Sequence, residues 1–249
     1  MEWWIYPLLV AAGFCAGFIN TLAGSGSVVS LAVLNLAGLP LDIANGTNRI
    51  AILLQNAVAV GRFKKQGKLQ VREHIGIILP AVAGGIAGAF IAGQVNAEVL
   101  RVSIGLCMLL VLFLLFFKPK RWLEGQTEKL HKRSGPVQMI SFFLVGLYGG
   151  YIQIGVGVFL LTALVMAAGF DLVRGNAMKL LIVLCYTIPV LAIFLMNGLV
   201  RWDLGLTLAA GNMLGAWVAT YEAAKRGAPF IRWLLIVVTA FSAFRYLVF

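Results

Sequence analysis

Charge is what this sequence has least of. Only 12% of its 249 residues are charged, whereas 61% are hydrophobic, and its mean hydropathy is +0.95. A soluble domain averages roughly 25% charged residues, so this chain has too little polar surface to cover itself in water. The composition therefore predicts an all-α integral membrane protein whose apolar helices are covered by lipid.

Acidic residues, histidine and cysteine are also scarce. The nine acidic residues all fall in loops or at the ends of apolar runs, where no proton or sodium relay inside the membrane would place them. The two histidines, His74 and His131, lie in loop positions, and the three cysteines lie in apolar runs without metal-ligand spacing. We therefore expect no metal site, no cofactor, no catalytic residues and no enzymatic activity.

The net charge of +11 comes from lysines and arginines in short loops between apolar runs. They do not line one helix face or form a tail, so we expect no nucleic-acid partner. An excess of Lys and Arg in loops is the usual mark of the cytoplasmic side of a membrane protein. The pattern predicts a multi-pass protein of the cell inner (plasma) membrane, with loops 62–72 and 118–135 in the cytoplasm.

Ten apolar segments are separated by short loops, five on each side of the polar stretch 118–135. We expect them near 4–24, 27–38, 43–61, 74–93, 98–117, 136–154, 156–169, 175–196, 203–221 and 229–249. This predicts a first transmembrane repeat at 1–117, a basic hinge loop at 118–135 and a second repeat at 136–249. Segments 27–38 and 156–169 are short, and either full spans or half-helices fit them.

The two halves resemble each other. The Gly84-x-x-x-Gly88 pattern matches Gly211-x-x-x-Gly215. Together with four other correspondences it forms a series of five, in the same order in both halves, at offsets of 127 to 131 residues. Five segments per half is an odd number, so the second copy should enter the membrane in the opposite direction. The loop charges alternate as two inverted repeats require. We interpret the two glycine pairs as helix-packing sites.

A polar break interrupts the apolar run of each half. Unpaired backbone groups are costly in hydrocarbon, so such a break survives where it lines a cavity or packs in protein, and paired broken segments point to a transporter's binding site. Packing by small residues is the alternative interpretation. The candidate substrate-binding residues at the two breaks are Asn20, Thr21, Gly24, Ser25 and Gly26, then Tyr151, Gln153 and Gly155.

Each half also carries one cation inside an apolar helix, Arg49 in the first and Lys179 in the second. No acidic residue stands at helical spacing from either of them, so a bound anion would complete the site. The alternative is that both side chains extend to the membrane surface. Thr47, Asn48 and Asn176 lie beside the cations and join the candidate site.

The run Ala-Gly-Phe-Ile-Asn-Thr-Leu-Ala-Gly-Ser-Gly-Ser, followed by Gly-Leu-Pro-x-x-x-Ala-Asn-Gly-Thr-Asn at 38–48, resembles the sulfite exporter TauE/SafE family of membrane permeases. The resemblance runs essentially end to end. It implies about eight spans in two repeats and the movement of sulfite or related organosulfur or organic anions. A family member usually has glycine near Gln153 and Val156, so the second break departs from the pattern.

Three functions compete as interpretations of these observations. The first is a secondary transporter that moves a small anion by alternating access between the two repeats. The second is a non-transporting structural subunit of a membrane complex, and the third is a membrane-embedded enzyme, which would need a nucleophile–base pair or metal ligands. The glycine pairs also allow a homo-oligomer, because they can pack within or between chains.

Overall fold

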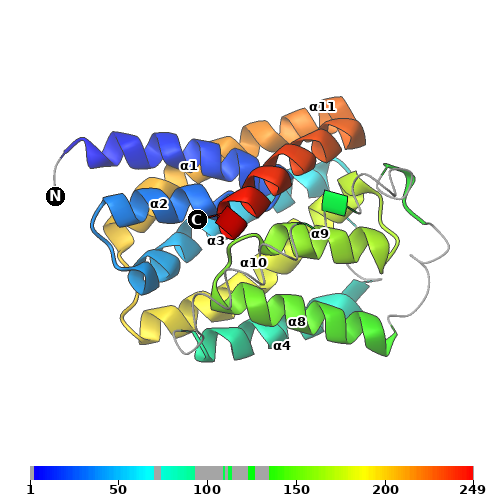
Figure 1. Cartoon of the computed structure of the whole chain (residues 1–249), viewed down its shortest axis with the longest axis horizontal. Coiled ribbons are helices and arrows are strands. Elements are labelled where there is room, and N and C mark those ends of the chain that lie inside the picture. Colours follow the sequence, from blue (N-terminus) through cyan, green and yellow to red (C-terminus); the bar gives the residue numbers. More distant parts are fainter. Residues whose placement is uncertain are drawn as a thin grey trace.

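The computed structural model describes residues 3–69, 74–92, 109, 112–113, 123–126 and 135–248. Every long element in these residues is an α-helix, as the composition predicts (Figure 1). Most of the predicted segment 98–117 and most of the predicted hinge 118–135 lie outside the described residues. The helices are α1 (Ile5–Leu22), α2 (Ser27–Leu36), α3 (Leu41–Lys65), α4 (Ile75–Phe90), α8 (Pro136–Tyr151), α9 (Val156–Met166), α10 (Leu172–Met196) and α11 (Trp202–Val248).

The helix α11 consists of two helices that meet at Gly227. This glycine has φ of 69° and ψ of −161°, which is not helical, and Pro229 follows it. Glycine adopts such a conformation without the clash of a Cβ, and proline cannot continue a preceding helix. The chain therefore turns back here, and the two predicted segments 203–221 and 229–249 are both present (Figure 1).

The short helices α2 and α9 are half-helices. They have 10 and 11 residues, which at 1.5 Å per residue gives about 15 Å, half of the roughly 30 Å of hydrocarbon in a bilayer. Each folds back on the helix before it. Gly26 at the start of α2 lies against the carbonyl of Ala16 in α1, and Gln138 at the start of α8 donates a hydrogen bond to the carbonyl of Ala167, just after α9.

The hairpins α1–α2 and α8–α9 enter the molecule from opposite ends. In Figure 1, α1 runs from the N-terminus at the left toward the right, whereas α8 begins at the right. We call residues 23–26, at the tip of the first hairpin, the first break, and residues 152–155, at the tip of the second, the second break.

Glycines join each hairpin to a helix of the opposite half. Gly211 and Gly215 of α11 lie against backbone carbonyls of α1, and Gly84 and Gly88 of α4 lie against backbone carbonyls of α8. A Cβ at any of these positions would come within 2.2 Å of a carbonyl oxygen. The packing role predicted for both glycine pairs is confirmed, and it joins α1 to α11 and α4 to α8.

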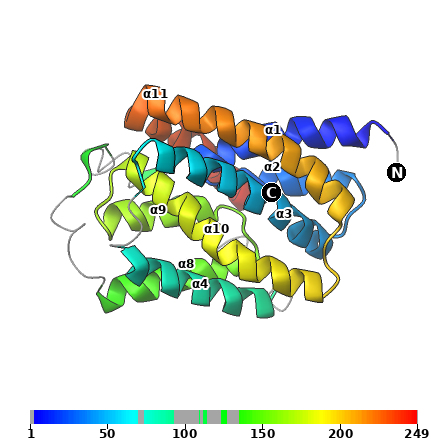
Figure 2. The same ribbon diagram turned by 180° about the vertical axis from the view of Figure 1, so that it is seen from behind.

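The long helices α3 and α10 pack against each other and run in opposite directions (Figure 2). Gly46, near the start of α3, lies against Phe194, near the end of α10. Phe63, near the end of α3, shares a buried cluster with Leu172 at the start of α10. A fixed start for α10 comes from Asp171, whose carboxylate accepts hydrogen bonds from the first N–H groups of the helix.

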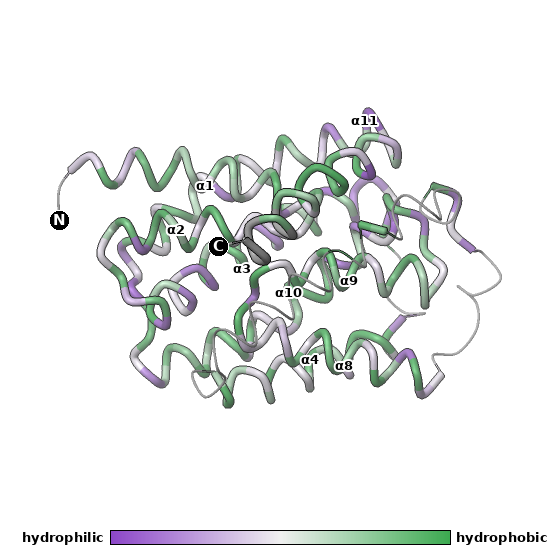
Figure 3. Tube along the Cα trace, in the orientation of Figure 1, coloured by the Kyte–Doolittle hydropathy of each residue, from purple (hydrophilic) through white to green (hydrophobic). Residues whose placement is uncertain are grey.

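Most residues along the helices are hydrophobic, and hydrophilic residues gather at the helix ends and in α3 (Figure 3). Large hydrophobic side chains such as Leu79, Leu144 and Phe241 are exposed, which fits a surface that faces lipid. By length and composition, two helices of the described part, α1 and α10, can each cross a membrane. The polar residues in the middle of α3, from Asn45 to Asn56, are buried and face the interior, whereas the charged residues at its two ends are not.

Candidate functional site

The first break lies against the start of α9, directly after the second break, and we call this contact the crossing. A Cβ placed on Gly24, in the first break, would lie 2.3 Å from the Cα of Gly157, at the start of α9. Gly24 also has φ of +82°, a conformation that L side chains rarely adopt. Glycine is therefore required at this position for two reasons, and the contact brings the N-terminal ends of α2 and α9 to the same region.

Lys179 of α10 binds the end of α1. Its Nζ donates to the carbonyl oxygens of Asn20 and Thr21, at 3.1 and 3.0 Å. These carbonyls belong to the last turn of α1, where no helical N–H remains to pair with them. A cation at this position also complements the negative end of the helix dipole. A side chain of the second half thus stabilises the hairpin of the first half.

Arg49 of α3 does the same for the end of α8. One guanidinium nitrogen donates to the carbonyl of Gly149 at 2.8 Å and the other to the carbonyl of Gly150 at 2.7 Å. A third, longer contact of 3.5 Å reaches the carbonyl of Tyr151. Arg49 lies 130 residues before Lys179, so the two cations cap the opposite hairpins in a reciprocal arrangement.

Neither cation extends to the membrane surface, so that alternative is wrong. Arg49 is 0% exposed and Lys179 is 1% exposed. Within the described residues, neither forms an ion pair, since the recorded pairs lie at helix ends and involve other residues. Backbone carbonyls satisfy hydrogen bonds but carry no net charge, so no carboxylate of the described residues balances either buried positive charge.

A cluster of buried amide side chains supports the end of α1, just before the first break. Two of its members, Gln55 and Asn212, were not predicted. Gln55 of α3 accepts hydrogen bonds from Asn20 at 3.3 Å and from Asn212 of α11 at 3.2 Å, and it donates to the hydroxyl of Thr21 at 3.4 Å. The sequence signal for Gln55 and Asn212 is a polar residue inside an apolar run, at a distance along the chain from either break.

The second break is held by Gln153 and by Tyr186 of α10, which was also not predicted. The side-chain oxygen of Gln153 accepts hydrogen bonds from Arg49 at 2.7 Å and from the hydroxyl of Tyr186 at 3.2 Å. Tyr186 lies 131 residues after Gln55. Thus α3 contacts the end of α1 through Gln55 and the second break through Arg49, and α10 contacts the same two places through Lys179 and Tyr186.

Several predicted site residues are buried with polar atoms that have no hydrogen-bond partner among the described residues. They are the hydroxyl of Ser25, Nε of Arg49 and both side-chain polar atoms of Asn48 and Asn176. The hydroxyl of Ser27, which was not predicted, is in the same state. Buried polar groups in proteins are nearly always hydrogen-bonded. Their position, beside the first break and on the helices that carry the cations, is consistent with a polar ligand site.

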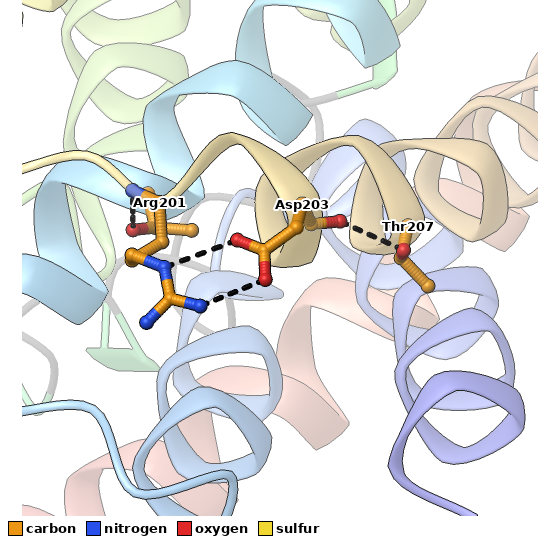
Figure 4. A network of polar contacts seen from close by, with 4 residues as sticks. Arg201, Asp203 and Thr207 are labelled. Carbon is orange, nitrogen blue, oxygen red and sulfur yellow. Dashed lines mark hydrogen bonds and ion pairs between the residues drawn. The ribbon is translucent and has the colours of Figure 1, made fainter. Parts of the chain in front are cut away.

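Thr47 lies in a different environment, at the end of the molecule opposite the basic loops. Its hydroxyl accepts a hydrogen bond of 3.0 Å from the backbone N–H of Arg201, in the link between α10 and α11. The guanidinium of Arg201 in turn pairs with Asp203, which raises the pKa of Arg201, and Thr207 donates to the carbonyl of Asp203 (Figure 4). The hydroxyl of Thr47 is therefore engaged by this link.

A cavity of about 340 Å³ reaches the second break from the end that holds Arg201. It is lined by Asp42 and Asn45 of α3, by Tyr151 and by Ile152 and Ile154 on either side of Gln153, together with other residues of α2, α10 and the adjoining loops. Asn45 donates a hydrogen bond of 2.9 Å to the carbonyl of Tyr151. Of the predicted site residues, Tyr151 lines this cavity. Gly26 and Gly155 instead begin the half-helices, as their N-caps.

Metal chemistry has no visible basis in the described part of the chain. No group of three or more His, Cys, Asp and Glu side chains lies there in a position to hold a metal ion. The polar groups at the two breaks are amides, hydroxyls and cations, which suit a ligand with negatively charged oxygens.

Comparison with known proteins finds relatives that are named as membrane transporters. Three relatives are "Probable membrane transporter protein ORF9" of Sinorhizobium sp (29% identical over 98% of this chain and 92% of the relative), "Probable membrane transporter protein" of Haemophilus influenzae (24%, over 94% and 91%) and "Probable membrane transporter protein YfcA" of Escherichia coli K12 (26%, over 95% and 88%). No solved structure matches the chain. The family model described as "Sulfite exporter TauE/SafE" matches residues 9–246, and the chain belongs to this family of membrane transporters.

Proposed function

We propose that this protein is a secondary transporter that moves a small anion, such as sulfite, a sulfonate or a related organic anion, across the inner membrane. The observation that carries the proposal is the pair of buried cations, Arg49 at the end of α8 and Lys179 at the end of α1, which have no carboxylate partner among the described residues. A buried charge at membrane depth costs several kcal/mol unless it is paired. An anion at the crossing supplies the missing negative charge.

Helix ends strengthen the attraction of an anion to this region. The helices α2 and α9 both begin at the breaks, and the N-terminus of a helix carries free N–H groups and a partial positive charge. Broken helices with their N-termini near the middle of the membrane are the usual substrate sites of transporters built from repeats. The name of the family supports sulfite as the first substrate to test.

Two inverted repeats are part of the proposal. The supporting contacts are reciprocal, because Arg49 of the first half caps α8 and Lys179 of the second half caps α1. The helix pairs α1–α11 and α4–α8 are likewise matched. Each pair combines one helix from each half, so movement of one pair against the other about the Gly24–Gly157 contact would alternate access to the site.

The orientation in the membrane follows from the loops. The end of α3 and the turn of α11 lie at the same end of the molecule (Figures 1 and 2). The sequence places Lys64 and Lys65 at the first of these and Lys225 and Arg226 at the second. By the positive-inside rule, this end faces the cytoplasm. The cavity beside Tyr151 then opens to the outside, which corresponds to an outward-facing arrangement.

Purified protein in detergent tests the proposal by anion-dependent thermal stabilisation, followed by flux of the stabilising anion into proteoliposomes. The panel is sulfite, sulfate, thiosulfate, sulfoacetate, taurine, acetate, lactate and chloride. A ligand at 100 times its Kd adds about 2.7 kcal/mol to the free energy of unfolding, which gives a measurable shift in Tm. We expect sulfur oxyanions or sulfonates to produce the shift and to be transported.

Lys179→Met should remove both the shift and the flux, whereas Lys64→Met, at an exposed lysine at the end of α3, should preserve them. Protein that is folded but transports no anion of the panel would contradict the proposal. Copurification with a fixed partner in that case would favour a structural subunit of a membrane complex.

A further inference from the structure

The two breaks occupy matching positions, yet their chemistry differs. The first break leads into α2 through Ser25, Gly26 and Ser27, so two hydroxyls flank the start of this half-helix. The second break leads into α9 through Gly155, Val156 and Gly157, which carry no polar side-chain atoms. If the protein binds an anion at the crossing, as proposed above, the two halves do not offer it equal sites.

The second break already contains an oxygen in the position that an anion would take. The side-chain oxygen of Gln153 lies 2.7 Å from a guanidinium nitrogen of Arg49 and 3.2 Å from the hydroxyl of Tyr186. Gln153 is 2% exposed and has φ of 62°, an uncommon conformation for a residue other than glycine. The hydroxyl of Tyr148 also donates to the carbonyl of Ile154. The second break is thus closed by the chain's own groups.

Among the residues that the structure describes, none places a side-chain oxygen on Lys179 at the first break. Nζ of Lys179 has three N–H donors, and two of them are used by Asn20 and Thr21. The backbone N–H groups of Ser25, Gly26 and Ser27 donate no backbone hydrogen bond within the described residues.

Nearby side chains add further unused donors. The hydroxyls of Ser25 and Ser27, which are 4% and 0% exposed, have no partner there, and neither does the amide of Asn176, one turn before Lys179. A cation, two hydroxyls, an amide and the free N–H groups of a helix start are the donors that bind a small oxyanion.

We propose that the protein binds one oxyanion per chain, at the first break, and that Gln153 is an internal substitute for a second anion at the second break. The ligand class is a small anion with at least two oxygens, because the site offers donors from both α10 and α2. Gln153 is then a specificity-determining residue: its side-chain oxygen satisfies Arg49 and Tyr186 permanently. Its neighbours Ile152 and Ile154 line the cavity at the second break.

Isothermal titration of the purified full chain with sulfite and with sulfate measures both the affinity and the number of bound anions. We expect one anion per chain in the wild type. The double substitution Ser25→Ala with Ser27→Ala should weaken binding about tenfold or more, because it removes two hydrogen bonds to a charged ligand. The matched control is Ser141→Ala, since this hydroxyl donates to the carbonyl of Val137 on the outside of α8.

Gln153→Gly tests the substitute directly, because glycine keeps the positive φ and removes the side-chain oxygen. We expect a second anion per chain, and we expect Gln153→Glu to remain at one anion because its carboxylate neutralises Arg49. Two anions per wild-type chain would overturn the inference, as would wild-type affinity in the folded serine variant. If Gln153→Gly does not fold, the serine variant decides alone. Absence of any anion binding by the wild type would instead refute the proposed function.

Discussion

The guanidinium of Arg49 lies 2.7 Å from the carbonyl oxygen of Gly150, although 101 residues separate them in the sequence. The same side chain also binds Gly149 and Gln153, so one residue of the first half holds the end of α8 and the second break together. Because the carbonyls it caps are buried, removal of the side chain leaves them without a donor.

Arg49→Met should therefore lower the free energy of unfolding by about 3 kcal/mol or more, since each hydrogen bond to a charged group contributes roughly 1.5–3 kcal/mol. Arg49→Lys should restore only part of this stability, because a single ammonium group cannot match the planar fork of donors. Thermal unfolding in detergent measures both variants. Arg174→Met, which removes a half-exposed ion pair on α10, should change Tm much less, and an equal loss in both would contradict the role of Arg49.

The contact between Gly24 and Gly157 gives a second prediction. Gly24→Ala adds a methyl group 2.3 Å from the Cα of Gly157 and places alanine at positive φ, so we expect strong destabilisation and loss of transport. Gly157→Ala should have the same sign, with a contact of 2.4 Å. Gly61→Ala is the control, because nothing lies within 4 Å of its added methyl and a helix gains about 0.5–1 kcal/mol from this change. Wild-type Tm in Gly24→Ala would show that Gly24 does not lie against Gly157.

The amide group around Gln55 allows a double-mutant cycle. Gln55→Leu leaves the side-chain amides of Asn20 and Asn212 without their acceptor, and we expect a loss of about 1–3 kcal/mol. Adding Asn212→Leu removes one of the orphaned groups, so the double variant should be more stable than the sum of the two single changes predicts. Strict additivity in thermal unfolding would mean that the two side chains do not interact.

Thr47 has a structural role in the link between α10 and α11, and its substitution should affect stability rather than substrate affinity. Thr47→Val removes the acceptor for the backbone N–H of Arg201, with an expected loss of about 1 kcal/mol and an unchanged Kd for the anion. Thr207→Val removes an exposed hydroxyl of the same network (Figure 4) and should have a smaller effect. A large rise in Kd for Thr47→Val would place this residue in the binding site.

The proposed orientation predicts which positions react with a membrane-impermeant thiol reagent in whole cells. In a background without the native cysteines, a cysteine at Asp42 should react from outside, because Asp42 lines the cavity at the outer end. A cysteine at Lys64, at the basic end of α3, should react only after the membrane is permeabilised. The reverse result would invert the topology and assign the cavity to the cytoplasmic side.

Much of the fold was predictable because hydrophobicity marks each helix directly. The segments expected at 136–154 and 175–196 correspond closely to α8 and α10, since lipid-covered helices need continuous apolar runs. Hydrophobicity alone does not predict whether α2 and α9 cross the whole membrane. A run of 12 to 14 apolar residues fits both a short span and a half-helix, and only packing against α1 and α8 decides between them.

The candidate site was predictable in its residue types but not in its contacts. Lys179 and Arg49 are conspicuous because a cation inside an apolar helix is rare. Their partners are backbone carbonyls of the opposite half, which have no signature in the sequence. Gln55 and Tyr186 were missed because one polar group in an apolar helix has many possible partners, and its role depends on which helix lies across from it.

The glycine contacts between α1 and α11 have a consequence for biogenesis. Gly17 of α1 lies against the backbone of Asn212, and the ribosome adds residues at about 5–20 per second. The first helix must therefore remain in the bilayer for on the order of ten seconds or more before its partner emerges. During that time its polar end, Asn20 and Thr21, also lacks Lys179. Insertion of this protein thus requires that the first helix stay in the bilayer without its partner until α11 is synthesised. A truncated chain ending before α11 leaves its first helix without that partner.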